Sequence, residues 1–370
     1  MTSIAYSLTK NYTGIALKIF YRELKIQGRS NIPKDKPVIF APNHQNSFLD
    51  AIIIACVVSR PIHYLVRASV FSSKLAKWAL GLLNMMPIYR FRDGLKEVKK
   101  NDAVISACTK LLSKNKWLLI FPEGNHSLNY SIRTLQKGIS RIAFQTIDKY
   151  GADVQVVPVG IYYEDHTAFR SRALVNFGKP INVKDYYHAY QKEATGGFNL
   201  LREELSGRMK PLTIHISPKE RYEEIYTRWR KVRPVHPDIS TQFQADTSII
   251  ESLKNGSEVS SKQRLKDSEI MRWALFLPYI YGVINHILPY KLMDLIMKKM
   301  VSDVHFFSSI KLAAGMVLVP ICYLMQTGLL YLLKVEWYWL LIYLVTLLPC
   351  GLVAYHYHKE WIRPKGSSSL

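Results

Sequence analysis

The stretch KPVIFAPNHQNSFLDAIIIACVV, residues 36–58, decides the fold of the N-terminal part of this chain. Its first apolar run, 37–42, predicts a strand, and its second, 48–58, predicts a helix or a buried segment. A short polar island that holds His44 and Asp50 separates the two runs. The function of this island is the first question that the sequence raises.

Two interpretations of the polar island are open from its residues. A neutral His44 imidazole can take a proton from an alcohol, and Asp50 would fix its tautomer and stabilise the imidazolium. Alternatively, Asn46 or Ser47 caps the following helix and Asp50 adds favourable charge at its first turn. The two roles are compatible, so spacing alone does not choose between them.

The alternation of strand-like and helix-like segments continues to about residue 180. Further runs typical of strands are 62–68, 86–91, 117–124, 154–164 and 172–178, and runs typical of helices are 75–84, 98–115 and 140–151. This alternation predicts an α/β fold with a mainly parallel central sheet flanked by helices. Ligands bind near the carboxyl ends of the strands in such sheets.

Polar turns follow two other predicted strands, RFRDG (90–94) and PEGNHS (122–127). At one sheet edge, Arg90 would bind a phosphate as a bidentate donor, or else form a surface salt bridge. Glu123 would bind hydroxyl groups or anchor the loop, and Gly124 would permit close backbone approach. The alternative for these two residues is an ordinary β-turn.

Basic residues beyond these turns are further candidates for substrate binding. Lys137 and Arg141 lie four positions apart at the start of a predicted helix. They would contact phosphate or coenzyme A, or be solvated. Arg170 and Arg172 are candidates of the same kind.

The motifs NH-x5-D (43–50), PIYRFRD (87–93), FPEGNHS (121–127) and VVPVGIYYED (156–165) follow one another in this order. In order and spacing they resemble the four blocks of the glycerolipid acyltransferases, over roughly residues 36–180. Within that family, the motif PIYRFRD and the segments 169–181 and 201–232 look closest to the fungal glycerol-3-phosphate/dihydroxyacetone-phosphate branch and its bacterial relatives.

The chain departs from the common family pattern in two places. Five residues separate His44 from Asp50, an HX5D motif, where the family usually has four; the fungal-like branch also has five. The third block usually continues with Thr and Arg, but Asn125 and His126 stand there. A phosphate-binding arginine is therefore absent from that position, and its role must lie elsewhere.

The resemblance implies acyl transfer from acyl-CoA or acyl carrier protein to a hydroxyl of glycerol 3-phosphate, dihydroxyacetone phosphate or 1-acylglycerol 3-phosphate. His44 would deprotonate the acceptor hydroxyl, Asp50 would orient His44, and the alkoxide would attack the thioester directly. No cofactor and no metal is expected. The alternatives are an acyltransferase that acts on an amino-acid lipid and a non-catalytic, membrane-anchored adaptor that binds lipid.

The composition indicates a polyanionic partner, because 50 Lys and Arg stand against 28 Asp and Glu, for a net charge of +22. An anionic membrane and phosphorylated substrates both fit this charge. A nucleic-acid partner is not expected, because the chain has no recognition motif and has apolar segments that suit a membrane. The four cysteines are far apart and show no metal-binding spacing.

Two uncharged stretches near the C-terminus, 312–333 and 337–355, are long enough to cross a membrane as a helical hairpin. Lysines and arginines flank the hairpin on both sides, which predicts an integral membrane protein whose catalytic domain faces the cytoplasm, in a bacterial inner membrane or in the endoplasmic reticulum. A third apolar stretch, 273–290, contains two prolines and a histidine. It spans the membrane, re-enters it or lies in its interface.

The whole chain is expected to have four parts. Residues 1–30 would form an amphipathic helical segment, and 31–234 the acyltransferase domain. Residues 235–270 are polar and would form a linker or a small helical insertion, before a membrane region at 271–365.

Overall fold

The computed structural model of the chain describes residues 4–71, 73–89, 101–257, 269–301 and 303–362. It divides into two compact units, Met1–Lys262 and Gln263–Leu370. Each unit is described by itself.

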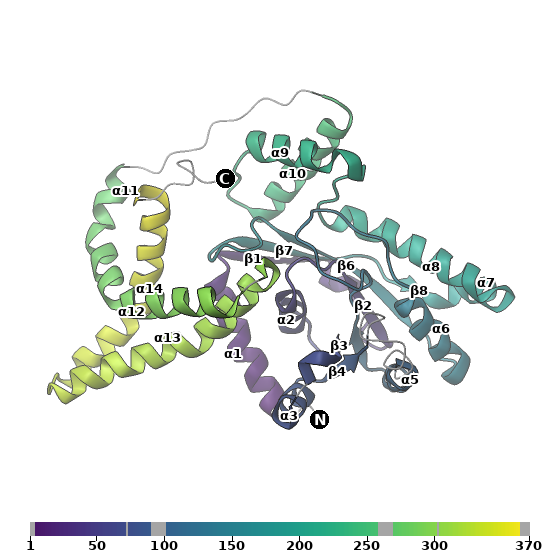
Figure 1. Cartoon of the computed structure of the whole chain (residues 1–370), viewed down its shortest axis with the longest axis horizontal. Coiled ribbons are helices and arrows are strands. Elements are labelled where there is room, and N and C mark those ends of the chain that lie inside the picture. Colours follow the sequence, from purple (N-terminus) through teal and green to yellow (C-terminus); the bar gives the residue numbers. More distant parts are fainter. Residues whose placement is uncertain (1–3, 72, 90–100, 258–268, 302, 363–370) are drawn as a thin grey trace. The chain divides into compact units, whose positions relative to one another are not determined.

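A sheet of eight strands in the order β1-β7-β6-β2-β5-β3-β4, with β8 beside β6, forms the centre of the described N-terminal unit (Figure 1). The strands are β1 Glu23–Gln27, β2 Val38–Pro42, β3 Ile62–Arg67, β4 Met85–Ile88, β5 Trp117–Leu119, β6 Gln155–Tyr163, β7 Arg172–Phe177 and β8 Ile181–Asn182. β2 lies in the middle and pairs in parallel with both β5 and β6.

The sheet is mainly parallel, as the sequence predicts. β1–β7, β3–β4 and β3–β5 are parallel pairs, and within the described residues the antiparallel pairs are β6–β7 and β6–β8. The polar loops after β2 and β5 therefore emerge at the same edge of the sheet.

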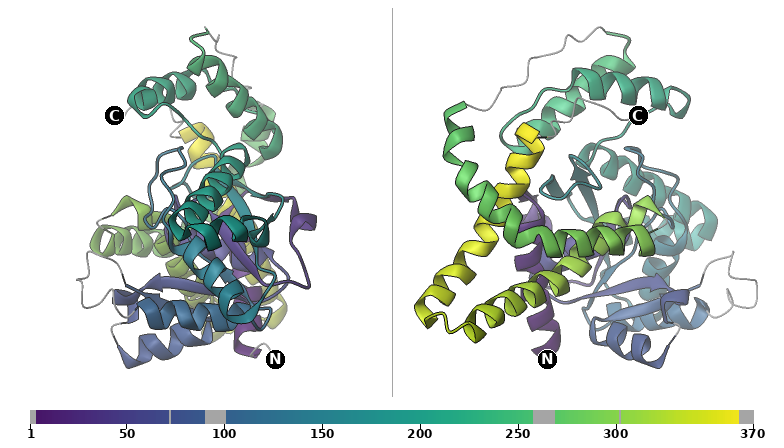
Figure 2. Two further views of the ribbon diagram at one scale, coloured as in Figure 1. Left: turned by 90° about the vertical axis from the view of Figure 1, so that its right-hand side faces the viewer. Right: turned by 60° about the vertical axis from the view of Figure 1, so that its left-hand side comes forward.

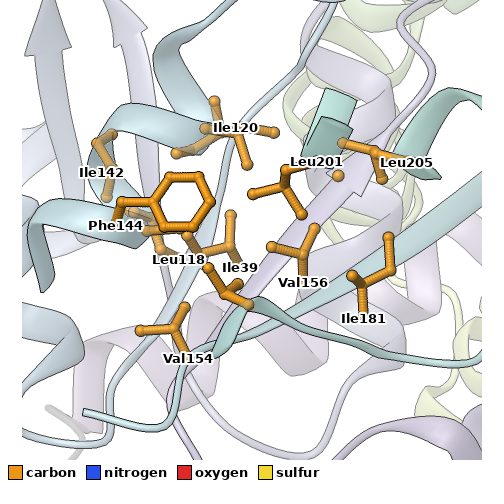
Figure 3. Packing of buried hydrophobic residues seen from close by; sticks show 14 of the residues in the cluster. Ile39, Leu118, Ile120, Ile142, Phe144, Val154, Val156, Ile181, Leu201 and Leu205 are labelled. Carbon is orange, nitrogen blue, oxygen red and sulfur yellow. The ribbon is translucent and has the colours of Figure 1, made fainter. Parts of the chain in front are cut away.

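Helices cover both faces of the sheet (Figures 1 and 2). They are α1 Ile4–Phe20, α2 Phe48–Val57, α3 Lys74–Leu82, α5 Asn101–Leu112, α6 Gly138–Tyr150, α7 Tyr187–Lys192, α8 Ala194–Met209, α9 Tyr222–Val232 and α10 Ile239–Lys254. Alternate residues of a strand point to opposite faces. Ile39 and Val156 thus join a buried apolar cluster with Phe144 of α6 and Leu201 of α8 (Figure 3).

The prediction of a helical segment over residues 1–30 is wrong after Phe20. α1 ends at Phe20, and Glu23–Gln27 form strand β1, which pairs along its whole length with β7. Local periodicity favoured a helix here, but pairing with a strand far along the chain supplies backbone hydrogen bonds that local sequence does not show.

The stretch 235–270 is not a linker throughout, because its first half contains helix α10. Asp238 caps this helix by accepting a hydrogen bond from the Thr241 backbone N–H. Ile239, Ile250 and Leu253 are buried in a cluster shared with α9, so the helix belongs to the N-terminal unit. Of the two expected alternatives, a linker or a small helical insertion, the structure shows the helical insertion over Ile239–Lys254.

The described C-terminal unit is helical and consists of α11 Glu269–Ala274, α12 Phe276–Met300, α13 Phe307–Leu332 and α14 Trp337–Tyr357. Two segments, Val304–Leu332 and Trp337–Ile362, are long and apolar enough to cross a membrane. They cover the two predicted spans, 312–333 and 337–355, except for Leu333. The third apolar stretch of the sequence lies at the end of α11 and in the first half of α12.

Candidate active site

The loop after β2 is fixed to the sheet by Asn43. Its side-chain amide donates to the Ile161 carbonyl at 3.0 Å, and its Oδ1 accepts from the Ile161 N–H at 2.6 Å. This pairing with β6 continues the contact between the two strands beyond the end of β2. The backbone that carries His44 therefore starts from a rigid position.

His44 and Asp50 form a hydrogen-bonded pair with 2.9 Å between Nδ1 and Oδ2. Asp50 is fully buried and His44 is only 9% exposed. A carboxylate accepts hydrogen bonds, so Nδ1 carries the proton and Nε2 holds the free lone pair of the neutral ring. The five intervening residues thus do not prevent the contact that the motif predicts.

Asp50 also organises the loop between the strand and the helix. Its Oδ2 accepts from the backbone N–H groups of Gln45, at 2.9 Å, and Asn46, at 2.8 Å. Ser47, the N-cap residue of α2, has a φ of 49° and makes no capping hydrogen bond with its side chain. Asp50, in the first turn of α2, accepts the hydrogen bonds of the loop amides instead. The same carboxylate therefore fixes both the His44 ring and the turn.

Tyr163 is a further partner of Asp50, and its sequence pattern does not mark it as a site residue. Its hydroxyl donates to Asp50 Oδ1 at 2.6 Å from the end of β6. Burial, and then the Asp50 charge, raise the pKa of Tyr163 well above its ordinary value, so the hydroxyl stays protonated. The only signal was its place in the fourth motif, because a tyrosine in an apolar strand looks like a core residue.

The His44 ring lies against the loop that follows β5. Phe121 stacks on it with 3.7 Å between ring centroids, and His126 meets it edge-on at 5.6 Å. The Ser127 N–H donates to the His44 carbonyl at 3.0 Å. The first and third motifs are therefore neighbours, because their strands are adjacent and parallel.

Glu123 lies in the same loop and forms an ion pair with Arg133. Arg133 Nε donates to Glu123 Oε2 at 2.8 Å, and a terminal nitrogen of Arg133 lies 2.6 Å from the same oxygen. Burial raises the pKa of Glu123 to about 7, although the Arg133 guanidinium lowers it. A carboxyl group that ionises near neutrality, beside an arginine, is thus close to His44 in the fold.

Arg133 stands near the position at which the family's arginine is missing. Its guanidinium also donates to the Asn125 carbonyl, so it lies over the turn that holds Asn125 in place of the usual threonine. No sequence pattern marks Arg133 as a site residue, because it follows the third motif in a segment without regular secondary structure. Folding of that segment over the turn places it there.

Gly124 has a φ of +71°, a conformation that suits glycine. A Cβ at this position would lie 3.1 Å from Gln136 Cγ. The Gln136 N–H also donates to the Pro122 carbonyl at 2.7 Å, so the segment leading into α6 lies against the turn. Gly124 therefore lies against Gln136 of the protein's own chain.

The remaining predicted residues differ in their placement. Lys137 is exposed at the N-terminus of α6, next to Gln136 and therefore near the turn. Arg141, one turn further, is paired with Asp102 of α5 at 2.9 Å. Arg172 is buried and donates two hydrogen bonds to the Glu164 carboxylate, so its guanidinium stabilises the fold. Arg90 lies outside the described residues.

Comparison with known proteins shows that part of the chain is similar to acyltransferases. Residues 23–162 match the acyltransferase family. A 1-acyl-sn-glycerol-3-phosphate acyltransferase of Chlamydomonas reinhardtii is 32% identical over 157 residues, 42% of this chain and 43% of that protein. Glycerol-3-phosphate O-acyltransferase 1 of Saccharomyces cerevisiae is 31% identical over 113 residues, 30% of this chain and 15% of that protein.

A solved structure is similar in part: the 1-acyl-sn-glycerophosphate acyltransferase PlsC of Thermotoga maritima, with 18% identity and a TM-score of 0.42 over 56% of this chain and 79% of that one. The chain spans less than half the length of the curated relatives described above. The matched segment holds His44, Asp50, Glu123 and Gly124. Residues 23–162 of this chain are therefore an acyltransferase domain of the glycerolipid type.

Proposed function

We propose that this chain transfers a fatty acyl group from an acyl thioester to a hydroxyl of a glycerol phosphate. The observation that carries the proposal is the buried contact of 2.9 Å between His44 Nδ1 and Asp50 Oδ2, which leaves Nε2 as a base. The relatives are named for glycerol 3-phosphate and 1-acylglycerol 3-phosphate acceptors. Acyl-CoA or acyl carrier protein would supply the acyl group.

In the proposed reaction, His44 Nε2 takes the proton of the acceptor hydroxyl as the oxygen attacks the thioester carbonyl. Asp50 stabilises the imidazolium that forms. The tetrahedral intermediate then expels the thiolate, so that the carbon–sulfur bond breaks and the ester remains. The proton held on His44 goes to the thiolate, which returns the imidazole to its neutral form.

The acceptor phosphate would bind near the turn that holds Glu123. Arg133 supplies a guanidinium there, and Lys137 supplies a second positive charge at the start of α6. An arginine binds a phosphate with parallel N–H donors. Arg133 would thus take the role that the family gives to an arginine in the third motif.

We also propose that α13 and α14 anchor the chain in a membrane with the acyltransferase domain on the cytoplasmic side. Both segments are long and apolar enough to cross. Lys298 and Lys311 on one flank and Lys359 on the other favour the cytoplasm for both ends of the hairpin. The enzyme would then work where its acylated product belongs.

A direct assay tests the proposed activity. The full chain would be purified in detergent and incubated with labelled acyl-CoA and a panel of acceptors, with the products separated as lipids. His44→Ala is expected to lower the rate about 10²–10⁴-fold, the contribution of a general base. His188→Ala, an exposed position on α7, is the matched control and should keep full activity. Undiminished transfer by the His44 variant would rule out the mechanism.

A further inference from the structure

Helix α12 of the C-terminal unit combines apolar outward positions with polar inward ones. Ile284 is 64% exposed, and Leu324 of α13 and Val345 of α14 are similarly exposed at 69% and 65%. The inward positions of α12 include Asn285 and His286, which bond to the neighbouring helices. This is the reverse of the pattern in a water-soluble helical bundle, where polar residues face outward.

The inward polar groups of α12 form hydrogen bonds to both neighbouring helices. His286 Nε2 lies 2.6 Å from the Tyr323 hydroxyl of α13. The Tyr343 hydroxyl of α14 donates to Asn285 Oδ1 at 2.7 Å. Polar side chains that join helices in this way are typical of interfaces between membrane helices, where no water competes for them.

A second feature ties α12 to α13 through its backbone. Pro289 has no N–H, so the Asn285 carbonyl four residues earlier loses its helical donor. Gln326 Nε2 of α13 donates to that carbonyl at 2.7 Å. In a membrane, a carbonyl freed by a proline needs another hydrogen-bond donor, and a side chain of a neighbouring helix is one source of it. α12 is visibly bent in Figures 1 and 2, as expected for a helix with an internal proline.

Glycines allow α12 and α14 to approach closely. A Cβ on Gly282 would lie 2.2 Å from the Cys350 carbonyl oxygen, and one on Gly351 would lie 2.4 Å from His286 Nε2. Small residues at such contacts are a second mark of helix packing in lipid. α12 is therefore an integral part of the bundle with α13 and α14.

We infer that the first half of α12, from Phe276 to Tyr290, is embedded in the hydrocarbon together with α13 and α14, and that lipid acyl chains cover its apolar face. This inference rests on the proposed membrane anchoring of those two helices. The segment is about 22 Å long, too short to cross a bilayer unaided. Lys291, Asp294 and Lys298 follow directly and mark where the helix leaves the hydrocarbon.

Spin labels can test this placement in the full chain, reconstituted in vesicles of phosphatidylcholine and phosphatidylglycerol. Single cysteines would replace Ile284 in α12, Leu324 in α13 and, as a water-exposed reference, Lys114 in the N-terminal unit. The native cysteines would first be changed to alanine; these are Cys56, Cys108, Cys322 and Cys350. Collision rates with oxygen and with a water-soluble nickel complex would be compared.

Labels at Ile284 and Leu324 are expected to collide mainly with oxygen, and the label at Lys114 mainly with nickel. A nickel-accessible Ile284 beside an oxygen-accessible Leu324 would overturn the inference and leave the anchoring intact. Nickel access at both sites would show that the anchoring itself fails. An Ile284 label shielded from both reagents would indicate a protein partner, such as a second copy, and would also overturn the inference.

The hydrogen bond from Gln326 to the Asn285 carbonyl can be tested separately. Gln326→Leu removes the donor, so the melting temperature of the detergent-purified chain should fall by several degrees. Met325→Leu changes an outward position of the same helix and is expected to leave the melting temperature unchanged. Equal melting temperatures for the two variants would contradict the role of Gln326 in holding α12.

Discussion

Asp50 accepts four hydrogen bonds, and only one of them comes from His44. The others come from two loop amides and from Tyr163. A residue that orients the His44 ring and also bonds to the amides of its loop cannot be changed without affecting both. Tyr163 is a better probe of the charge on Asp50, because its hydroxyl makes one contact with the carboxylate and is not part of the loop.

Tyr163→Phe is expected to lower kcat about tenfold with little change in KM, since a hydrogen bond to a charged group contributes about 1.5–3 kcal/mol. Steady-state kinetics would measure both constants. The neighbouring Tyr162 points to the opposite face of the sheet and bonds to Asp246 of α10. Tyr162→Phe therefore controls for loss of stability and should leave kcat near that of the unchanged protein. Equal effects on kcat would contradict a specific role for Tyr163.

The ion pair between Glu123 and Arg133 leads us to expect that substitution of Arg133 changes the pH dependence of activity. Burial raises the pKa of Glu123 to about 7, and the positive charge of Arg133 limits this rise. If the carboxylate form is the active one, Arg133→Leu should move the acid limb of the kcat/KM profile to higher pH, because the carboxyl group then loses its proton only in more alkaline solution. Arg208→Leu, a surface pair with Glu204 on α8, is the control. An unmoved acid limb in the Arg133 variant would show that this carboxyl group does not govern activity.

The sequence was sufficient to predict contacts that lie within one short motif. His44 and Asp50 are six positions apart, so a turn brings them together, and this was expected. Arg133 and Tyr163 reach the site from separate loops and strands. Their places depend on strand order and on the path of an irregular segment, which residue types alone do not reveal.

At the scale of elements, α10 is held to the sheet by a buried acid. Asp246 accepts hydrogen bonds from Trp229, Gln242 and Arg233 and lies fully buried. Arg233 in turn reaches the Tyr162 hydroxyl on β6. The cluster links α9 and α10 to β6, the strand that carries Tyr163. Both helices lie beyond the residues that match the family.

Asp246→Ala should destabilise the protein by about 3–5 kcal/mol, because it leaves the Arg233 guanidinium buried without its counter-charge. The expected result is a much lower midpoint in chemical or thermal unfolding of the purified chain. Glu251→Ala removes an exposed acid from the same helix and is expected to change the midpoint little. A midpoint as high for the Asp246 variant as for the Glu251 variant would mean that the cluster contributes no net stability.

Most strands and helices of the sheet were predictable, since each carries its own apolar periodicity. β1 was not, because Glu23–Gln27 is partly exposed and follows a real amphipathic helix. α10 was obscured by its many polar residues, several of which are buried in hydrogen bonds and not solvated. In both cases the tertiary partners, and not the local pattern, select the structure.

At the scale of the whole molecule, charge and hydrophobicity suggest two kinds of attachment to a membrane. A net charge of +22 attracts anionic lipid surfaces, and salt screens that attraction. Insertion of apolar helices is not weakened by salt. The two contributions can therefore be separated by washing.

Membranes that contain the full chain should retain it after washing in high salt and after alkaline carbonate extraction, as measured by immunoblotting of pellet and supernatant. The physical reason is that α13 and α14 have no charged residue over most of their length, so release would expose them to water. Release by salt alone would contradict insertion and leave only surface attraction.

The position of β1 in the sheet has a consequence for the time course of folding. β1 pairs with β7, which is synthesised roughly 150 positions later. At usual rates of translation, β1 then waits roughly ten to thirty seconds before its partner exists. During that time an unpaired strand and the apolar side of α1 are exposed, and such edges invite aggregation. Early capture by a chaperone or by the membrane surface would protect the nascent chain during this interval.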